Sequence, residues 1–229
     1  MPEDRAYAHL PVLLEEVVSW LSPGLTGPAT VIDCTLGGGG HSEALLERMP
    51  QVSVVGIDRD EDALTAASDR LGRFGERVKM IHSNYRRLSP AFEAADEPVK
   101  GVLYDLGVSS PQLDLADRGF QYRGDAPLDM RMDRSESQTA AEIVNSYSNK
   151  DLARVLSVYG EERFASRIAR AVVAERSRAP IRTAGQLAEI VKSAIPAPAR
   201  RKGPHPARRT FQALRIEVNQ ELESLEESL

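Results

Sequence analysis

Residues 30–42 read Thr30-Val31-Ile32-Asp33-Cys34-Thr35-Leu36-Gly37-Gly38-Gly39-Gly40-His41-Ser42, and this stretch decides the fold. Its first five residues are mostly β-branched or apolar, which predicts a buried strand. The four glycines let a ligand approach the backbone, because no Cβ intervenes, and they lead into a helix beginning near Ser42. A helix N-terminus favours negative groups. A strand, a glycine loop and a helix in this order are typical of α/β proteins that bind nucleotides.

Strand and helix patterns alternate outward from this stretch over the first hundred residues. Apolar runs predict further strands at residues 52–57, 78–81 and 101–104, and Asp60 is expected to be the N-cap of a helix between the first two runs. Strands separated by helices of this length predict a parallel, doubly wound, Rossmann-like sheet with right-handed crossovers. Ligands bind such sheets beyond the carboxyl ends of the strands.

The composition limits the class of protein. A chain of 229 residues that is 41% hydrophobic and 28% charged has room for one domain with an insertion. The N-terminus lacks a signal-peptide pattern and no run is apolar enough to span a bilayer, so we expect a cytoplasmic protein without a membrane partner. The single cysteine excludes an internal disulfide, and four scattered histidines lack zinc-ligand spacing, so no metal is expected.

Charge is distributed unevenly along the chain. The net charge is −5, yet residues 163–209 contain twelve Lys or Arg against two acids. Arg163, Arg167 and Arg170 follow one another at i, i+4 and i+7, which places them on one helix face. Such a block is compatible with a solvated face, and on so acidic a chain it equally indicates a polyanionic partner.

The second half of the chain has a different pattern. Residues 107–135 are rich in Gly, Pro, Asp and Arg and predict a long functional loop, after which three helices follow. A last helix is expected to carry one amphipathic stripe from Phe211 to Leu229, and Trp20 to anchor an N-terminal helix. We therefore expect an α/β domain made of residues 1–113 and 210–229, interrupted by an all-helical insertion over residues 114–209.

The nature of the ligand follows from the residues around the loop. Asp58 lies 21 residues after Gly37 at a strand end, where a carboxylate reaches the ribose hydroxyls of a nucleoside. A nicotinamide dinucleotide fingerprint needs a third glycine where this chain has Ser42. An acid upstream of a glycine-dense loop instead resembles the S-adenosylmethionine motif of class I methyltransferases. The acids Asp33, Asp58 and Asp105 also suit a sulfonium and would repel a pyrophosphate.

Longer motifs make the resemblance specific. They are residues 9–14, 37–42, 105–113, 119–120, 127–133, 160–165 and 205–216, among them Asp105-Leu106-Gly107-Val108-Ser109-Ser110-Pro111-Gln112-Leu113. Over essentially its whole length the chain resembles the 16S rRNA (cytosine-N4)-methyltransferase family, which methylates the exocyclic amine of a cytosine in the decoding region of small-subunit rRNA.

The resemblance implies a cofactor, a partner and site residues. The cofactor is S-adenosylmethionine, and the partner is 16S rRNA in the small ribosomal subunit. The residues expected to bind the cofactor are Gly39, Gly40, His41, Asp58, Tyr85, Asp105 and Gln112. Asp105 is also the candidate catalytic residue, because a carboxylate that accepts the amine's hydrogens localises the nitrogen lone pair.

The helical insertion is expected to hold the RNA. Its candidate phosphate contacts are Arg163, Arg167, Arg170, Arg200, Arg201 and Lys202, while loop 107–135 would recognise the base. Gly107-Val108-Ser109-Ser110 stands where amino-methyltransferases commonly have a Pro-Pro-aromatic turn. Stacking on the target base would then fall to Tyr85, Phe120 or Tyr122.

The resemblance also implies that the family continues beyond Leu229, through a glycine-rich turn and strands that include a His-bearing motif. Without these strands the last helix would expose part of its stripe, which would either lower solubility or allow pairing as a homodimer. Two other functions stay open: an NAD-type oxidoreductase on the same fold, and a non-catalytic RNA-binding assembly protein.

Overall fold

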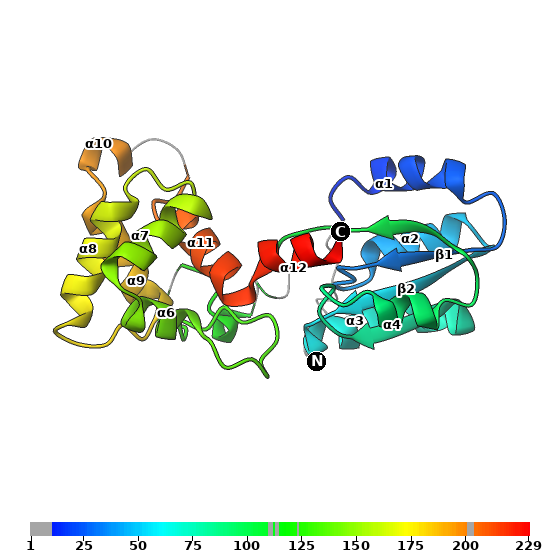
Figure 1. Ribbon diagram of the computed structural model, residues 1–229, viewed down its shortest axis with the longest axis horizontal. Coiled ribbons are helices and arrows are strands. Elements are labelled where there is room, and N and C mark those ends of the chain that lie inside the picture. The colour runs from blue at the N-terminus through cyan, green and yellow to red at the C-terminus, as the bar shows by residue number, and fades with distance from the viewer. Residues whose placement is uncertain (1–10, 110–111, 113–114, 123, 201–203) are drawn as a thin grey trace, which may run out of the picture. The chain divides into compact units, whose positions relative to one another are not determined.

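The computed structural model describes residues 11–109, 112, 115–122, 124–200 and 204–229. The chain divides into two compact units (Figure 1). The first comprises Met1–Pro111 and Glu223–Leu229, and the second comprises Gln112–Leu222. No helix among the described residues is both long and apolar enough to cross a membrane.

The first unit is built on a parallel sheet of four strands: β1 (Ala29–Asp33), β2 (Val52–Asp58), β3 (Val78–His82) and β4 (Val99–Leu103). Their order, β3-β2-β1-β4, confirms the α/β, doubly wound sheet predicted from the sequence. The chain runs outward from β1 to β3 and then crosses to β4 on the other side of β1. The carboxyl ends of β1 and β4 therefore form the switch point of the sheet, where ligands of such folds bind.

Helices cover both faces of the sheet. Alternate side chains of β1 point to opposite faces, so neighbouring residues of this strand pack against different helices. The covering helices are α1 (Leu14–Leu21), α2 (Gly40–Arg48), α3 (Glu61–Leu71) and α4 (Ser89–Ala94). Val31 packs in one cluster with side chains of α1 and α2, whereas Ile32 packs in another with Ala91 of α4. The predicted N-cap of α3 is confirmed, since the Asp60 side chain accepts from the Asp62 N–H at 3.1 Å.

The prediction that Trp20 anchors the N-terminal helix is wrong, because its side chain is 85% exposed. The helix instead turns Leu14, Val18 and Leu21 toward the core. Residues 12–21 are apolar on more than one face, so their spacing alone does not determine which face is buried.

The elements described in the second unit are helical, apart from one isolated antiparallel bridge between Pro127 and Thr183. The helical elements are the 3-10 turn η3 (Ala116–Arg118) and the helices α6 (Ala140–Ser146), α7 (Asn149–Val158), α8 (Ala165–Arg176), α9 (Ala184–Ala194), α10 (Ala197–Arg200) and α11 (Arg208–Asn219). Side chains cap the N-termini of two of these helices: Ser148 accepts from the Asp151 N–H before α7, and Thr183 forms a reciprocal capping box with Gln186 at α9. The core of the unit is aliphatic and includes Ile143, Leu156 and Ile168.

The boundary after the helical unit differs from the expected one. We expected the insertion to end at residue 209, whereas residues 210–222 group with the second unit. The reason is that α11 packs against α6 and α7 and buries Phe211 and Leu214 there.

The single last helix expected from the sequence is also wrong. The chain breaks at Gln220, which adopts the left-handed conformation (φ 48°, ψ 43°) between α11 and α12 (Glu221–Ser228). The two guanidinium N–H groups of Arg215 donate to the Glu221 carboxylate at 2.7 and 2.9 Å and span the break. Apolar residues keep helical spacing on both sides, so the hydrophobic period does not reveal one left-handed residue between them.

The end of α12 completes the first unit. Ser224 is fully buried, and its Oγ accepts from the Asn84 side-chain amide at 3.2 Å, across 140 positions of sequence. Glu227 forms an ion pair with Arg86 at 3.1 Å. The first unit is therefore assembled from both ends of the chain.

Candidate functional site

The glycine loop that follows β1 is held closed by Asp33. This carboxylate is fully buried and accepts from the Thr35 N–H at 3.2 Å and from the Ser42 hydroxyl at 2.7 Å. Burial raises the pKa of Asp33, while the bonds from Ser42 and Thr35 act in the opposite direction. Because Thr35 and Ser42 flank the four glycines, Asp33 clamps the two ends of the loop together.

Asp58, at the carboxyl end of β2, contacts the middle of the same loop. One carboxylate oxygen accepts from the Gly37 N–H at 2.8 Å and the other accepts from the Asp60 N–H at 2.9 Å. Burial raises the pKa of Asp58 to about 6, against the effect of these two N–H donors. Each carboxylate oxygen has a second lone pair, so this fixed side chain retains acceptor capacity for a ligand.

Glycine is required at Gly39, the N-cap of α2, because this residue adopts the left-handed conformation (φ 77°, ψ 15°). A Cβ at this position would lie 2.9 Å from the Leu71 Cδ1 in the core. Any side chain at Gly39 would therefore disturb both the turn and the packing of α3.

His41 and Asp105 lie close together at the switch point. His41 is buried in the first turn of α2, and its Nδ1 lies 3.8 Å from the Oδ2 of Asp105. The backbone N–H of Asp105 donates to the Thr35 hydroxyl at 2.7 Å, while its side chain is 49% exposed. The carboxylate of Asp105 is thus anchored through its backbone and accessible to solvent.

Tyr85 lies beyond the end of β3. Its ring packs edge-on against Tyr104, with 5.8 Å between the ring centroids, beside the cluster that contains Ile32. Gln112 is buried but belongs to the second unit. Its role in cofactor binding stays a prediction.

Within the first unit, six of the predicted cofactor residues surround the carboxyl ends of the strands: Gly39, Gly40, His41, Asp58, Tyr85 and Asp105. Sequence reasoning missed Thr35 and Ser42, the hydroxyls that hold Asp33 and Asp105. Their only signal is that hydroxyl residues flank a glycine loop that follows an acid.

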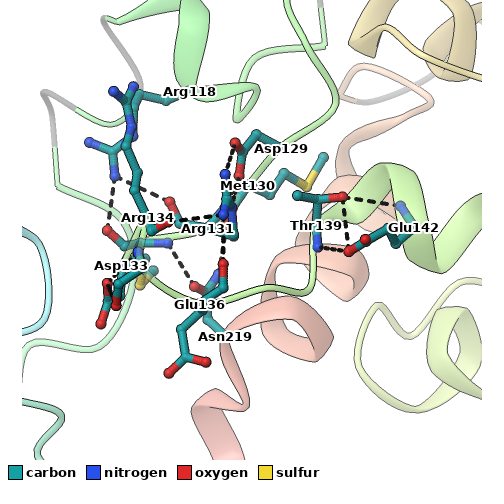
Figure 2. A network of polar contacts seen from close by, with 12 residues as sticks. Arg118, Asp129, Met130, Arg131, Asp133, Arg134, Glu136, Thr139, Glu142 and Asn219 are labelled. Atoms are coloured by element: carbon teal, nitrogen blue, oxygen red, sulfur yellow. Dashed lines mark hydrogen bonds and ion pairs between the residues drawn. The ribbon is translucent and has the colours of Figure 1, made fainter.

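The loop in the second unit is braced by buried polar groups (Figure 2). Arg118, 2% exposed, donates to the backbone carbonyls of Arg131 and Met132 at 3.2 and 3.0 Å. Asn219 of α11 donates to the Met130 carbonyl and accepts from the Met132 N–H, both at 2.8 Å. The backbone of residues 130–132 is therefore fixed by hydrogen bonds to Arg118 and Asn219, despite the lack of sequence periodicity there.

Two of the three aromatic residues expected to stack on the target base, Phe120 and Tyr122, lie in the second unit, and both are packed against other residues. Phe120 is only 6% exposed, so its ring is not available at the surface in this structure. Tyr122 is stacked on His205, with 4.3 Å between centroids, and meets Phe211 edge-on. Tyr122 is half-buried, and a stacking role for it stays a prediction.

Arg163, Arg167 and Arg170, in α8 and the turn before it, are exposed. Arg163, Arg167 and Arg170 form no ion pair with any described residue, although the nearby Arg178 pairs with Glu175 at 2.9 Å. Arg200 is half-buried at the end of α10, and Arg201 and Lys202 lie outside the described residues.

The chain is similar to known proteins over nearly its whole length. Residues 6–229 match the model of the MraW methylase family. A protein named ribosomal RNA small subunit methyltransferase H from Salinispora tropica is 59% identical over 228 residues, which cover 97% of this chain and 62% of that protein. A protein of the same name from Thermobifida fusca is 55% identical over 226 residues, covering 98% and 68%. The chain thus spans about two thirds of the length of these relatives.

A solved structure also resembles part of the chain. An rRNA methylase from Streptococcus thermophilus aligns over 47% of this chain and 62% of its own, with 24% identity and a TM-score of 0.36.

Proposed function

Because the chain belongs to the MraW methylase family, we propose that it transfers a methyl group from S-adenosylmethionine to the N4 amine of a cytosine in 16S rRNA. The observation that carries this proposal is the hydrogen bond between the Asp58 carboxylate and the Gly37 N–H, at 2.8 Å. It puts a strand-end acid and a glycine loop at one point of the sheet, where a nucleoside is recognised by its ribose and by the exposed backbone.

The residues present fit this cofactor. Gly39 and Gly40 allow the tight loop beside which the methionine end would lie, because each packs against a neighbouring side chain where a Cβ would not fit. The remaining lone pairs of Asp58 suit two ribose hydroxyls. Three carboxylates gather here, those of Asp33, Asp58 and Asp105. Burial has the largest effect and raises the pKa of both Asp33 and Asp58; in addition, the charge of Asp105 raises the pKa of Asp33, and that of Asp33 raises the pKa of Asp58. Such a negative site favours a positively charged ligand over a pyrophosphate.

S-adenosylmethionine supplies an electrophilic methyl group on a positively charged sulfur. The protein's part is to position the amine and to manage its protons. Asp105 is anchored by Thr35 and half exposed, so it can accept a hydrogen bond from the amine and take the proton that methylation releases. Tyr85 completes the part of the proposed cofactor site that lies in the first unit.

The second unit is proposed to hold the RNA. Exposed Arg163, Arg167 and Arg170 lack acidic partners among the described residues, which suits contacts with phosphates. Arg200, Arg201 and Lys202 are proposed to extend this surface. The target cytosine must leave its stack to reach a catalytic carboxylate.

Methyl transfer is tested with tritiated S-adenosylmethionine and small ribosomal subunits that lack the modification. We expect label in the N4 position of one cytosine, and loss of that label with Asp105→Ala. Asp96→Ala is the matched control, since Asp96 pairs with Lys79 on the surface away from the loop. Absence of label with wild-type protein, despite RNA binding, would instead support a non-catalytic assembly protein.

Calorimetry separates the proposal from the oxidoreductase alternative, which the family match does not favour. We expect heat of binding with S-adenosylmethionine and none with NAD. The reverse result would overturn the proposed function.

A further inference from the structure

The segment Pro11–Leu13, which precedes α1, contacts the glycine loop at two successive residues. A Cβ on Gly40 would lie 2.4 Å from the Cγ of Pro11, so the proline ring rests directly on the Gly40 backbone. The Nε2 of His41 lies 3.0 Å from the Val12 carbonyl oxygen. Pro11 therefore contacts Gly40, and Val12 contacts His41, at the start of α2.

The hydrogen bond to the Val12 carbonyl determines which ring nitrogen of His41 carries a proton. A carbonyl oxygen only accepts hydrogen bonds, so Nε2 of His41 must carry a proton. The other ring nitrogen, Nδ1, then faces Asp105, 3.8 Å from its Oδ2. The backbone of Val12 thereby orients the imidazole between the N-terminal segment and Asp105.

Burial of side chains does not explain how the segment is held. Val12 and Leu13 are 61% and 62% exposed. Leu13 also adopts the left-handed conformation (φ 54°, ψ 34°), which is energetically unfavourable for a leucine. The segment contacts the start of α2 through the Val12 carbonyl, which faces His41, and through the Pro11 ring, which packs on Gly40.

We infer that Pro11–Leu13 is a further part of the methyl-donor site, a positioning segment that fixes Gly40 and His41 in the conformation that binds the donor. The inference rests on the proposed function. Displacing the segment should therefore weaken donor binding through the conformation of Gly40 and His41.

A double-mutant cycle tests the inference, with dissociation constants for S-adenosylmethionine measured by calorimetry. Gly40→Ala drives a Cβ into Pro11 and should weaken binding about tenfold, as expected for overpacking. Pro11→Ala removes the Cγ and Cδ that this Cβ meets. The double variant should therefore recover to within about threefold of wild type. Gly72→Ala, where a Cβ meets nothing within 4 Å, is the matched control and should bind like wild type.

The outcomes separate the inference from its premise. Donor binding by wild type, with a double variant as weak as Gly40→Ala, would overturn the positioning segment and leave the proposed function standing. Absence of donor binding by wild type would overturn both.

A second measurement needs no variant. Saturating S-adenosylmethionine should slow hydrogen exchange in a peptide covering residues 11–21 as well as in the loop peptide. Slowing confined to the loop would overturn the inference, even if Gly40→Ala failed to fold.

Discussion

Lowering the pH should weaken donor binding through Asp58. Ribose hydroxyls donate hydrogen bonds to a carboxylate, so the donor binds the ionised form of Asp58. Because burial raises the pKa of Asp58 to about 6, the ligand-free carboxyl is about 97% ionised at pH 7.5, about half ionised at pH 6 and about 9% ionised at pH 5. The dissociation constant should therefore rise about twofold at pH 6 and about elevenfold at pH 5.

The assay is calorimetric titration with S-adenosylmethionine from pH 5 to pH 8 at constant ionic strength. Asp58→Asn is the control, because it cannot ionise while the donor's own amine and Asp33 still titrate in it. This variant should bind about ten- to a hundredfold more weakly at pH 7.5, as expected for a lost charge-assisted hydrogen bond. The ratio of wild-type to variant affinity should fall by about tenfold between pH 7.5 and pH 5. A ratio that stays constant over this range would refute the role given to Asp58.

Three further changes have definite expected outcomes. Charge reversal of Arg167 and Arg170 to Glu should weaken RNA binding and reduce its dependence on salt, while the affinity for S-adenosylmethionine stays unchanged. Arg178→Glu is the control and should have a smaller effect, because Arg178 is already paired with Glu175. Unchanged RNA affinity of the double variant at moderate salt would show that this surface does not bind RNA. Gln220→Gly should raise the free energy of unfolding by about 1 kcal/mol in urea denaturation, because glycine adopts the left-handed conformation without strain, and an unchanged midpoint would contradict this. Asn219→Ala should lower the free energy of unfolding by about 2–3 kcal/mol, because it removes the side chain that pairs with the Met132 N–H and the Met130 carbonyl. A loss below about 0.5 kcal/mol would show that other contacts fix this part of the backbone.

Local patterns in the sequence predicted the four strands of the first unit and the helices that follow the first two strands. The apolar runs and the Asp60 N-cap predicted the order of strands and helices, and the family resemblance is confirmed by the match over residues 6–229. Parallel strands place their carboxyl ends at one edge of the sheet, so the spacing from Gly37 to Asp58 was enough to predict their proximity.

What the sequence did not reveal depends on single backbone conformations or on distant partners. The left-handed residue Gln220 leaves the hydrophobic period intact, so one helix was expected where two are present. Arg118 and Asn219 are polar residues buried against backbone groups of the loop, and no local pattern specifies those partners. The contact of His41 with Val12 joins residues 29 positions apart and was equally hidden.

The discontinuous first unit has a consequence for synthesis on the ribosome. Asn84 emerges 140 residues before Ser224, so at about 5–20 residues per second it waits on the order of ten seconds for its partner. In that interval the nascent sheet lacks its last helical turns, while the intervening helices can already fold as they leave the exit tunnel. We therefore expect the first unit to complete its folding after the second unit, although most of the first unit is synthesised earlier.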